Sequence, residues 1–157
     1  MPYLDTSFIA PLFVIEGTSK AVEAYLLKLP AGSLITGAWT KVEFASLVSR
    51  RQRMGELTAE QAQEVRAEFA RVTAESVTLL TPTAADYELA AELLANFKSG
   101  LRAGDALHLA TAHNQGGLEV LSLDKTLVKA ANSLGIKASA GICVSRKAIA
   151  PKTREGK

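Results

Sequence analysis

Short apolar runs alternate along the chain with longer stretches in which apolar residues recur at helical spacing. The short runs predict five strands, over 3–4, 33–36, 77–80, 119–123 and 136–138. The longer stretches predict helices over 6–13, 18–29, 38–54, 58–74, 83–97, 104–114 and 125–134. Strands separated by helices indicate right-handed crossovers and a parallel sheet covered on both faces. We therefore predict an α/β fold with three α/β/α layers around a short central parallel sheet.

Two local signals support the helix boundaries. Gly55 follows the predicted helix over 38–54, at the position where a left-handed residue commonly ends a helix. Thr58 stands three residues before Gln61, which is the spacing of a capping box and predicts the start of the next helix.

The length of 157 residues predicts a single domain, since domains usually hold about 100–200 residues. Charge divides the chain in two. Residues 146–157 carry five basic side chains and one acid, whereas residues 1–145 carry 13 basic and 15 acidic ones. The net charge of +2 therefore comes from the end of the chain. We predict one domain over 1–145 and a flexible basic tail over 146–157. The positive charge of this tail would suit a polyanionic partner, and the simpler interpretation is a solvated end of the chain.

Composition narrows the class of protein. Hydrophobic residues make up 48% of the chain and charged residues 22%, which is typical of a globular protein. No apolar run reaches the length of about 18 residues that spans a bilayer, and no signal-peptide pattern is present. A single cysteine, Cys143, fits a reducing compartment. We expect a cytoplasmic protein that does not enter a membrane.

Four acids stand in unusual places. Asp5 and Asp124 each follow a predicted strand, so they meet at one edge of the sheet if the two strands are neighbours. That edge, beyond the carboxyl ends of the strands, is where parallel sheets bind ligands. Asp105 begins a helix that is apolar on nearly all sides, and Glu43 lies within the apolar stripe of the helix over 38–54.

Each of these acids also has a simpler interpretation. An aspartate ahead of a helix, or in its first turn, caps free backbone N–H groups. Glu43 can lie at the edge of its apolar stripe and reach water. The joint pattern favours chemistry, because four carboxylates that converge repel one another and require divalent cations.

The segments around these acids resemble the PIN-domain nucleases, and their order and spacing resemble those of the VapC-type toxins of type II toxin–antitoxin pairs. They are residues 3–7 (YLDTS), 41–45 (KVEFA), 101–112 (LRAGDALHLATA) and 121–127 (LSLDKTL). The resemblance covers residues 1–138. It implies a PIN-like fold and a metal-binding quartet made of Asp5, Glu43, Asp105 and Asp124.

The resemblance also implies a function. Ser7 would orient a ligand carboxylate or a metal-bound water. One or two Mg²⁺ or Mn²⁺ ions would support hydrolysis of RNA phosphodiester bonds, leaving 5′-phosphate and 3′-hydroxyl ends. The chain would be an endoribonuclease, a homodimer and the toxin partner of a small antitoxin protein. A housekeeping nuclease of RNA processing is one alternative, and a catalytically silent PIN-like module that binds RNA or protein is another. A dehalogenase-like phosphotransfer domain fits poorly, because Ser7 stands where that pattern needs a second aspartate.

Basic residues and histidines near the acids have open interpretations. Arg102 either contacts phosphate or pairs with an acid of the site, and we favour the pairing. His108 follows Asp105 by three residues and is expected to be a core histidine. Three arginines end the helix over 38–54, where they either complement the helix dipole or form a phosphate track: Arg50, Arg51 and Arg53.

Overall fold

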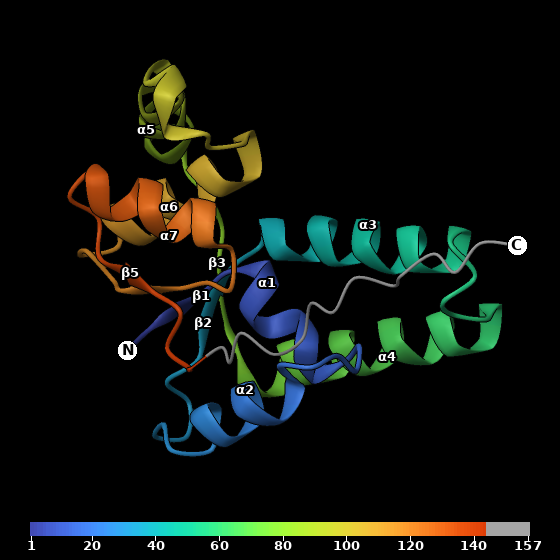
Figure 1. Ribbon diagram of the computed structural model, residues 1–157. Helices are drawn as coiled ribbons and strands as arrows, with labels where there is room; N and C mark the ends of the chain where they lie inside the picture. The colour runs from blue at the N-terminus through green and yellow to red at the C-terminus, as the bar shows by residue number, and fades with distance from the viewer. Residues whose placement is uncertain (144–157) are drawn as a thin grey trace, which may run out of the picture.

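The computed structural model describes residues 1–143, which form an α/β fold around one five-stranded parallel sheet. Figure 1 shows the sheet at the centre of the molecule. Its strands are β1 (Tyr3–Leu4), β2 (Ile35–Gly37), β3 (Thr78–Leu80), β4 (Val120–Leu121) and β5 (Ala138–Ser139), in the order β3-β2-β1-β4-β5. The predicted fold class is thus confirmed. The predicted basic tail over 146–157 lies outside the described residues.

Seven α-helices and two 3-10 turns connect and cover the strands of the described chain. They are α1 (Thr6–Ile9), η1 (Ala10–Leu12), α2 (Ser19–Leu26), α3 (Trp39–Arg53), α4 (Ala59–Ser76), α5 (Ala84–Ala95), η2 (Phe97–Ser99), α6 (Ala103–Asn114) and α7 (Lys125–Ser133). The predicted capping box is present, since the Gln61 N–H donates to Thr58 Oγ1 at 3.2 Å. Within residues 1–143, none of these helices combines the length and the apolar character needed to cross a membrane.

The predicted helix over 6–13 differs from the structure. It divides into the single α-helical turn of α1 and the 3-10 turn η1. Pro11 is the physical reason, because it has no N–H to donate to the carbonyl four residues earlier.

Helices cover both faces of the sheet, which confirms the three layers. Successive strand residues point to opposite faces. Leu4 and Leu121 pack with side chains of α1 to α4, whereas Tyr3 and Val120 pack with α6 and α7. Helix α5 lies outside α6 and packs against it through small residues such as Ala90 and Ala106.

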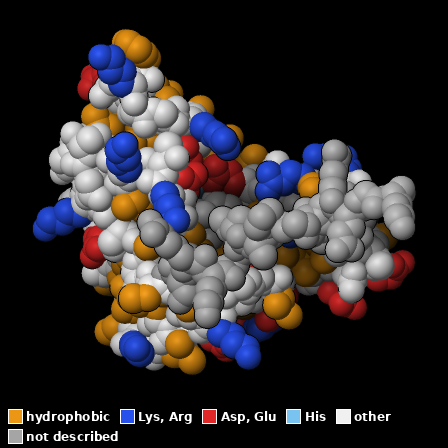
Figure 2. Space-filling view, viewed as in Figure 1, with side chains coloured by type: hydrophobic (Ala, Val, Ile, Leu, Met, Phe, Trp, Pro, Cys, Tyr) orange, Lys and Arg blue, Asp and Glu red, His pale blue; other side chains and the backbone are white. Residues whose placement is uncertain are grey.

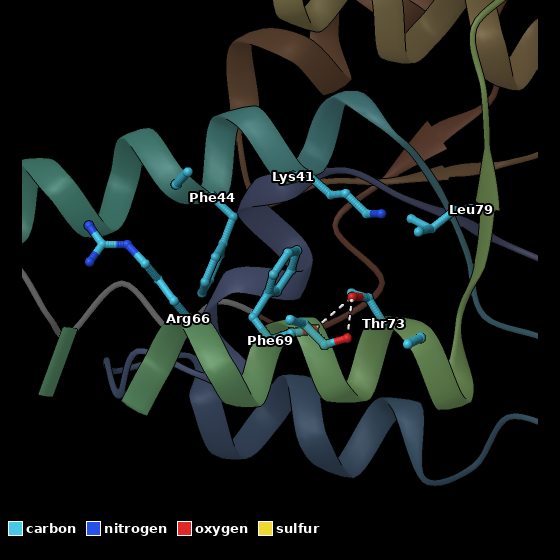
Figure 3. A pocket seen from close by; sticks show the side chains of 9 residues that line it. Lys41, Phe44, Arg66, Phe69, Thr73 and Leu79 are labelled. Carbon is cyan, nitrogen blue, oxygen red and sulfur yellow. Dashed lines mark hydrogen bonds between the residues drawn. The ribbon is translucent and has the colours of Figure 1, made fainter. Parts of the chain in front are cut away.

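Helices α3 and α4 form an arm that extends beyond the sheet (Figure 1). Phe44 and Phe69 stack face to face between them, with ring centroids 3.9 Å apart and an interplanar angle of 12°. An apolar groove of about 320 Å³ lies along this contact (Figure 3). It is lined by Lys41, Phe44, Ala45, Arg66, Phe69, Ala70, Thr73, Ala74 and Leu79. None of the four predicted acids lines it, so this groove is separate from the candidate site.

Candidate functional site

Asp5 and Asp124 lie at the same edge of the sheet. They follow β1 and β4, which are neighbouring parallel strands that pair Tyr3 with Val120 and Leu4 with Leu121. The sequence predicted this meeting only on the condition that the two strands are adjacent, and the strand order meets that condition.

Asp5 is a buried carboxylate held by three donors. Its Oδ1 accepts from the Ser7 hydroxyl at 2.8 Å and from the Phe8 N–H at 3.0 Å, and its Oδ2 accepts from the Ser122 hydroxyl at 2.8 Å. Burial raises the pKa of Asp5 above its ordinary value, although the charge of His108 and these donors favour the ionised form. The side chain therefore has one orientation, and its charge lacks the solvation that water would supply.

Ser7 and Ser122 link Asp5 to the end of β4. Ser7 Oγ accepts the Leu123 N–H at 2.9 Å, and Ser122 Oγ accepts the Asp124 N–H at 3.0 Å. The predicted contact between Ser7 and a site carboxylate is thus present. Ser122 is fully buried, and its contact with Asp5 was not predicted from the sequence.

Asp124 caps α7. Its Oδ1 accepts from the Thr126 N–H at 2.7 Å and from the Leu127 N–H at 3.2 Å. The side chain thus does what the simpler interpretation of the sequence proposed. Its second oxygen, Oδ2, has no hydrogen-bond partner within residues 1–143.

Asp105 occupies the first turn of α6 and also acts as a cap, since its Oδ2 accepts the Arg102 N–H at 3.0 Å. Burial raises the pKa of Asp105, and the negative charges of Asp124 and Glu43 raise it further. A carboxylate that is both half-buried and repelled by its neighbours is costly to ionise without a cation.

Glu43 reaches the site from α3. Its Oε2 accepts from the Thr6 hydroxyl and lies 2.7 Å from Nε2 of His108. Burial raises the pKa of Glu43, but these hydrogen bonds outweigh burial and hold the pKa below its usual range. The buried indole nitrogen of Trp39 faces the same carboxylate without forming a well-aligned hydrogen bond.

The four acids gather but do not converge on one point. Acidic side chains fill a hollow between the α3–α4 arm and the helices at the other end of the sheet, with basic side chains on both sides (Figure 2). Within residues 1–143, no Lys or Arg forms an ion pair with Asp5, Glu43, Asp105 or Asp124. Over the same residues, no three His, Cys, Asp or Glu side chains are arranged so that they could hold a metal ion.

The donor set nevertheless fits a hard divalent cation. It consists of carboxylate oxygens, which Mg²⁺ and Mn²⁺ prefer, and it contains no thiolate. Asp105 and Asp124 each keep one oxygen outside their helix caps. The metal-binding role of the quartet stays a prediction.

The roles of the neighbouring basic residues are partly different from those expected. His108 is buried, as predicted, but it also contacts Glu43, which the sequence did not indicate. The predicted pairing of Arg102 is wrong: the side chain is exposed and pairs with no acid among the described residues, and only its backbone meets Asp105.

Arg51 pairs with Glu16 at 3.3 Å and with Glu56 at 2.5 Å, so its charge is already engaged on the helix surface.

Several solved structures share this architecture. The VapC20 toxin of Mycobacterium tuberculosis, described as cleaving the sarcin-ricin loop, aligns with a TM-score of 0.67 and 19% identity, over 87% of this chain and 96% of that one. FitAcB from Neisseria gonorrhoeae aligns with a TM-score of 0.64 and 20% identity, over 88% of this chain and 96% of that one. A toxin–antitoxin complex from Klebsiella pneumoniae aligns with a TM-score of 0.56 and 18% identity, over 82% of this chain and 90% of that one. At such identities the likeness concerns the fold.

Sequence comparison identifies the family directly. No curated protein matches the chain. The family model described as the PIN domain matches residues 3–133, which include every strand except β5 and all four acids. Because this match spans most of its length, the chain belongs to the PIN-domain family.

Proposed function

We propose that this chain is a divalent-metal-dependent endoribonuclease that hydrolyses RNA phosphodiester bonds as the toxin of a VapBC-type pair. One observation carries the proposal. Asp105, Asp124 and Glu43 gather beside the ends of β1 and β4, where burial and the two neighbouring charges raise the pKa of Asp105, and no Lys or Arg of residues 1–143 pairs with any of the three. Such an arrangement stores unfavourable charge that a cation relieves.

The residues that would hold Mg²⁺ or Mn²⁺ are Asp5, Glu43, Asp105 and Asp124. When bound, one or two such ions supply an activated water and stabilise the leaving oxygen in phosphodiester cleavage. Asp5 is fixed beforehand by Ser7, Ser122 and the start of α1. Asp105 and Asp124 would reach the ion by rotating their free oxygens toward it. No protein nucleophile is needed.

The comparisons support the substrate class and the partner. VapC20 is described as cleaving the sarcin-ricin loop, and the Klebsiella pneumoniae neighbour is a toxin–antitoxin complex. By likeness to them, the chain would act on RNA and be inhibited by a cognate antitoxin protein. The homodimer and the cytoplasmic location belong to the same proposal and rest on the sequence resemblance alone.

A silent PIN-like module is the second candidate, and one observation favours it. Asp5, Asp105 and Asp124 all cap helices, so each has a structural reason to be present without any metal. The two candidates differ in what a divalent cation does. A nuclease requires it for cleavage, whereas a silent module does not respond to it.

Cleavage of labelled RNA by the purified chain tests the proposal. We expect cleavage with Mg²⁺ or Mn²⁺, none in excess EDTA, and loss in Asp5→Asn. The matched control is Asp86→Asn, because Asp86 is also buried and also caps a helix, but lies on α5 outside the site. Cleavage that survives in Asp5→Asn means that the active site is assigned wrongly. Growth arrest on expression, absent in Asp5→Asn, tests the toxin role separately.

A further inference from the structure

A buried chain of hydrogen bonds leads from the core of the sheet to the acidic site. The Tyr3 hydroxyl lies 2.7 Å from Nδ1 of His108, and Nε2 of the same ring lies 2.7 Å from Oε2 of Glu43. Tyr3 and His108 are only 1% and 2% exposed, and their rings meet edge to face with centroids 5.7 Å apart. Both ring nitrogens of His108 are therefore occupied, one by the core and one by a predicted metal ligand.

The direction of these hydrogen bonds follows from their partners. Burial raises the pKa of Tyr3 well above its ordinary value, so its phenol keeps its proton. The Glu43 carboxylate accepts, so Nε2 of His108 is the donor in that contact, and the Tyr3 phenol can donate to Nδ1.

Two glycines leave space for the ends of this chain. A Cβ at Gly37 would overlap the Tyr3 hydroxyl and would lie 3.8 Å from Nδ1 of His108. A Cβ at Gly104 would overlap Oε1 of Glu43. Neither glycine has a positive φ, so close approach of side chains, and not backbone conformation, accounts for the missing Cβ.

We propose that His108 is a positioning residue for Glu43, and that Tyr3 in turn fixes the His108 ring. The inference rests on the proposed function, because the orientation of Glu43 matters only if its carboxylate binds the cation. The Glu43 side chain is 27% exposed, so without its hydrogen bond to His108 it has other rotamers available. Hydrogen-bond partners that orient metal ligands typically contribute about 10–100-fold to metal affinity or activity.

Two substitutions of His108 separate positioning from packing. The amide nitrogen of His108→Gln reaches about as far as Nε2, so it can still donate to Glu43. His108→Asn is shorter and reaches only the level of Nδ1. Both variants lose the imidazole and its edge-to-face contact with Tyr3, and His108→Asn removes one buried methylene more than His108→Gln.

The measurement is calorimetric titration of the full chain with Mn²⁺, alongside thermal unfolding in EDTA and kcat and KM for RNA cleavage. We expect His108→Asn to weaken Mn²⁺ binding by about 10–100-fold, and His108→Gln to stay close to the wild type. We expect both variants to unfold below the wild type in EDTA, and His108→Asn below His108→Gln because it leaves the larger cavity. For cleavage, we expect His108→Asn to lower kcat more than it raises KM at subsaturating Mn²⁺. Equal Mn²⁺ affinities in the two variants would overturn the inference.

Tyr3→Phe provides a second test that leaves His108 in place. It removes one buried hydroxyl, and Thr73→Val is the control because it removes another, in α4, that donates to the Phe69 carbonyl at 2.7 Å. We expect both variants to lose stability, but only Tyr3→Phe to lose Mn²⁺ affinity. Unchanged affinity in Tyr3→Phe overturns the role of Tyr3. A wild-type chain that binds no Mn²⁺ overturns the proposed function, which is a different and distinguishable result.

Discussion

Replacing Gly104 by alanine places one methyl group against the Glu43 carboxylate. Gly104 lies in the first turn of α6 without a positive φ, so alanine suits the backbone and favours the helix by about 0.5–1 kcal/mol. The added Cβ, however, would overlap Glu43 Oε1 and would lie 2.8 Å from Trp39 Nε1. Glu43 is the partner that can move, because its side chain is partly exposed.

The magnitude follows from what Glu43 loses when it moves. An overlap that is not relieved costs about 1–3 kcal/mol. Rotation of the Glu43 side chain relieves the overlap but breaks its hydrogen bonds to Thr6 and His108. A buried hydrogen bond to a charged group contributes about 1.5–3 kcal/mol, and a half-exposed one contributes less. Offset by the gain in helix propensity, the free energy of unfolding should fall by about 1–2 kcal/mol. Mn²⁺ affinity should fall by about 10–100-fold.

Urea unfolding in EDTA gives the stability change, and calorimetric titration with Mn²⁺ gives the affinity change. Gly17→Ala is the control, because a Cβ at Gly17 would meet no atom within 4 Å. If Gly104→Ala folds and binds Mn²⁺ as tightly as the wild type, the position of Glu43 does not contribute to the metal site, and the reasoning fails.

Three further predictions concern stability. Mn²⁺ at 100 times its dissociation constant should raise the free energy of unfolding by about 2.7 kcal/mol; a urea midpoint that is the same with Mn²⁺ and with EDTA would contradict this. Burial and the charges of Asp124 and Glu43 raise the pKa of Asp105 in the folded chain. The folded chain therefore holds this proton more tightly than the unfolded chain, whose Asp105 has a pKa of about 4, and the free energy of unfolding falls as the pH rises from there through the folded pKa. In EDTA, the stability of Asp105→Asn relative to the wild type should therefore increase as the pH rises above about 4, and a difference that does not change with pH would contradict this. Phe69→Ala removes a nearly buried ring stacked on Phe44 and should cost about 3–5 kcal/mol in urea unfolding, while the folded fraction should bind Mn²⁺ with unchanged affinity.

Much of the fold follows from local signals in the sequence. The helix predicted over 38–54 is present as Trp39–Arg53, and the capping box of Thr58 marks the start of α4 as expected. The strand predicted over 3–4 is present unchanged as β1. The other four lie near their predicted positions but are shifted or shortened by one to three residues, because pairing with a neighbour decides which residues of an apolar run join the sheet. The order β3-β2-β1-β4-β5 could not be read from periodicity, since it depends on which crossovers bury the apolar faces of the helices.

The site was predicted less completely than the fold. Strand ends and an apolar helix pointed to Asp5, Asp124 and Asp105, because a charge next to a buried element is visible in the sequence. The contact between His108 and Glu43 joins residues 65 positions apart and has no local signal. Arg102 was expected to pair with an acid, but the backbone conformation that lets Asp105 cap α6 leaves the Arg102 side chain in solvent.

The proposed function requires that the carboxylates beside the ends of β1 and β4 bind a divalent cation. Crystals of the chain grown with Mn²⁺, measured for anomalous scattering, test it most directly. We expect an anomalous peak bounded by Asp5, Asp105 and Asp124, with Glu43 reaching it directly or through water. A peak elsewhere, or no peak while Asp105 and Asp124 remain in their helix caps, would contradict it.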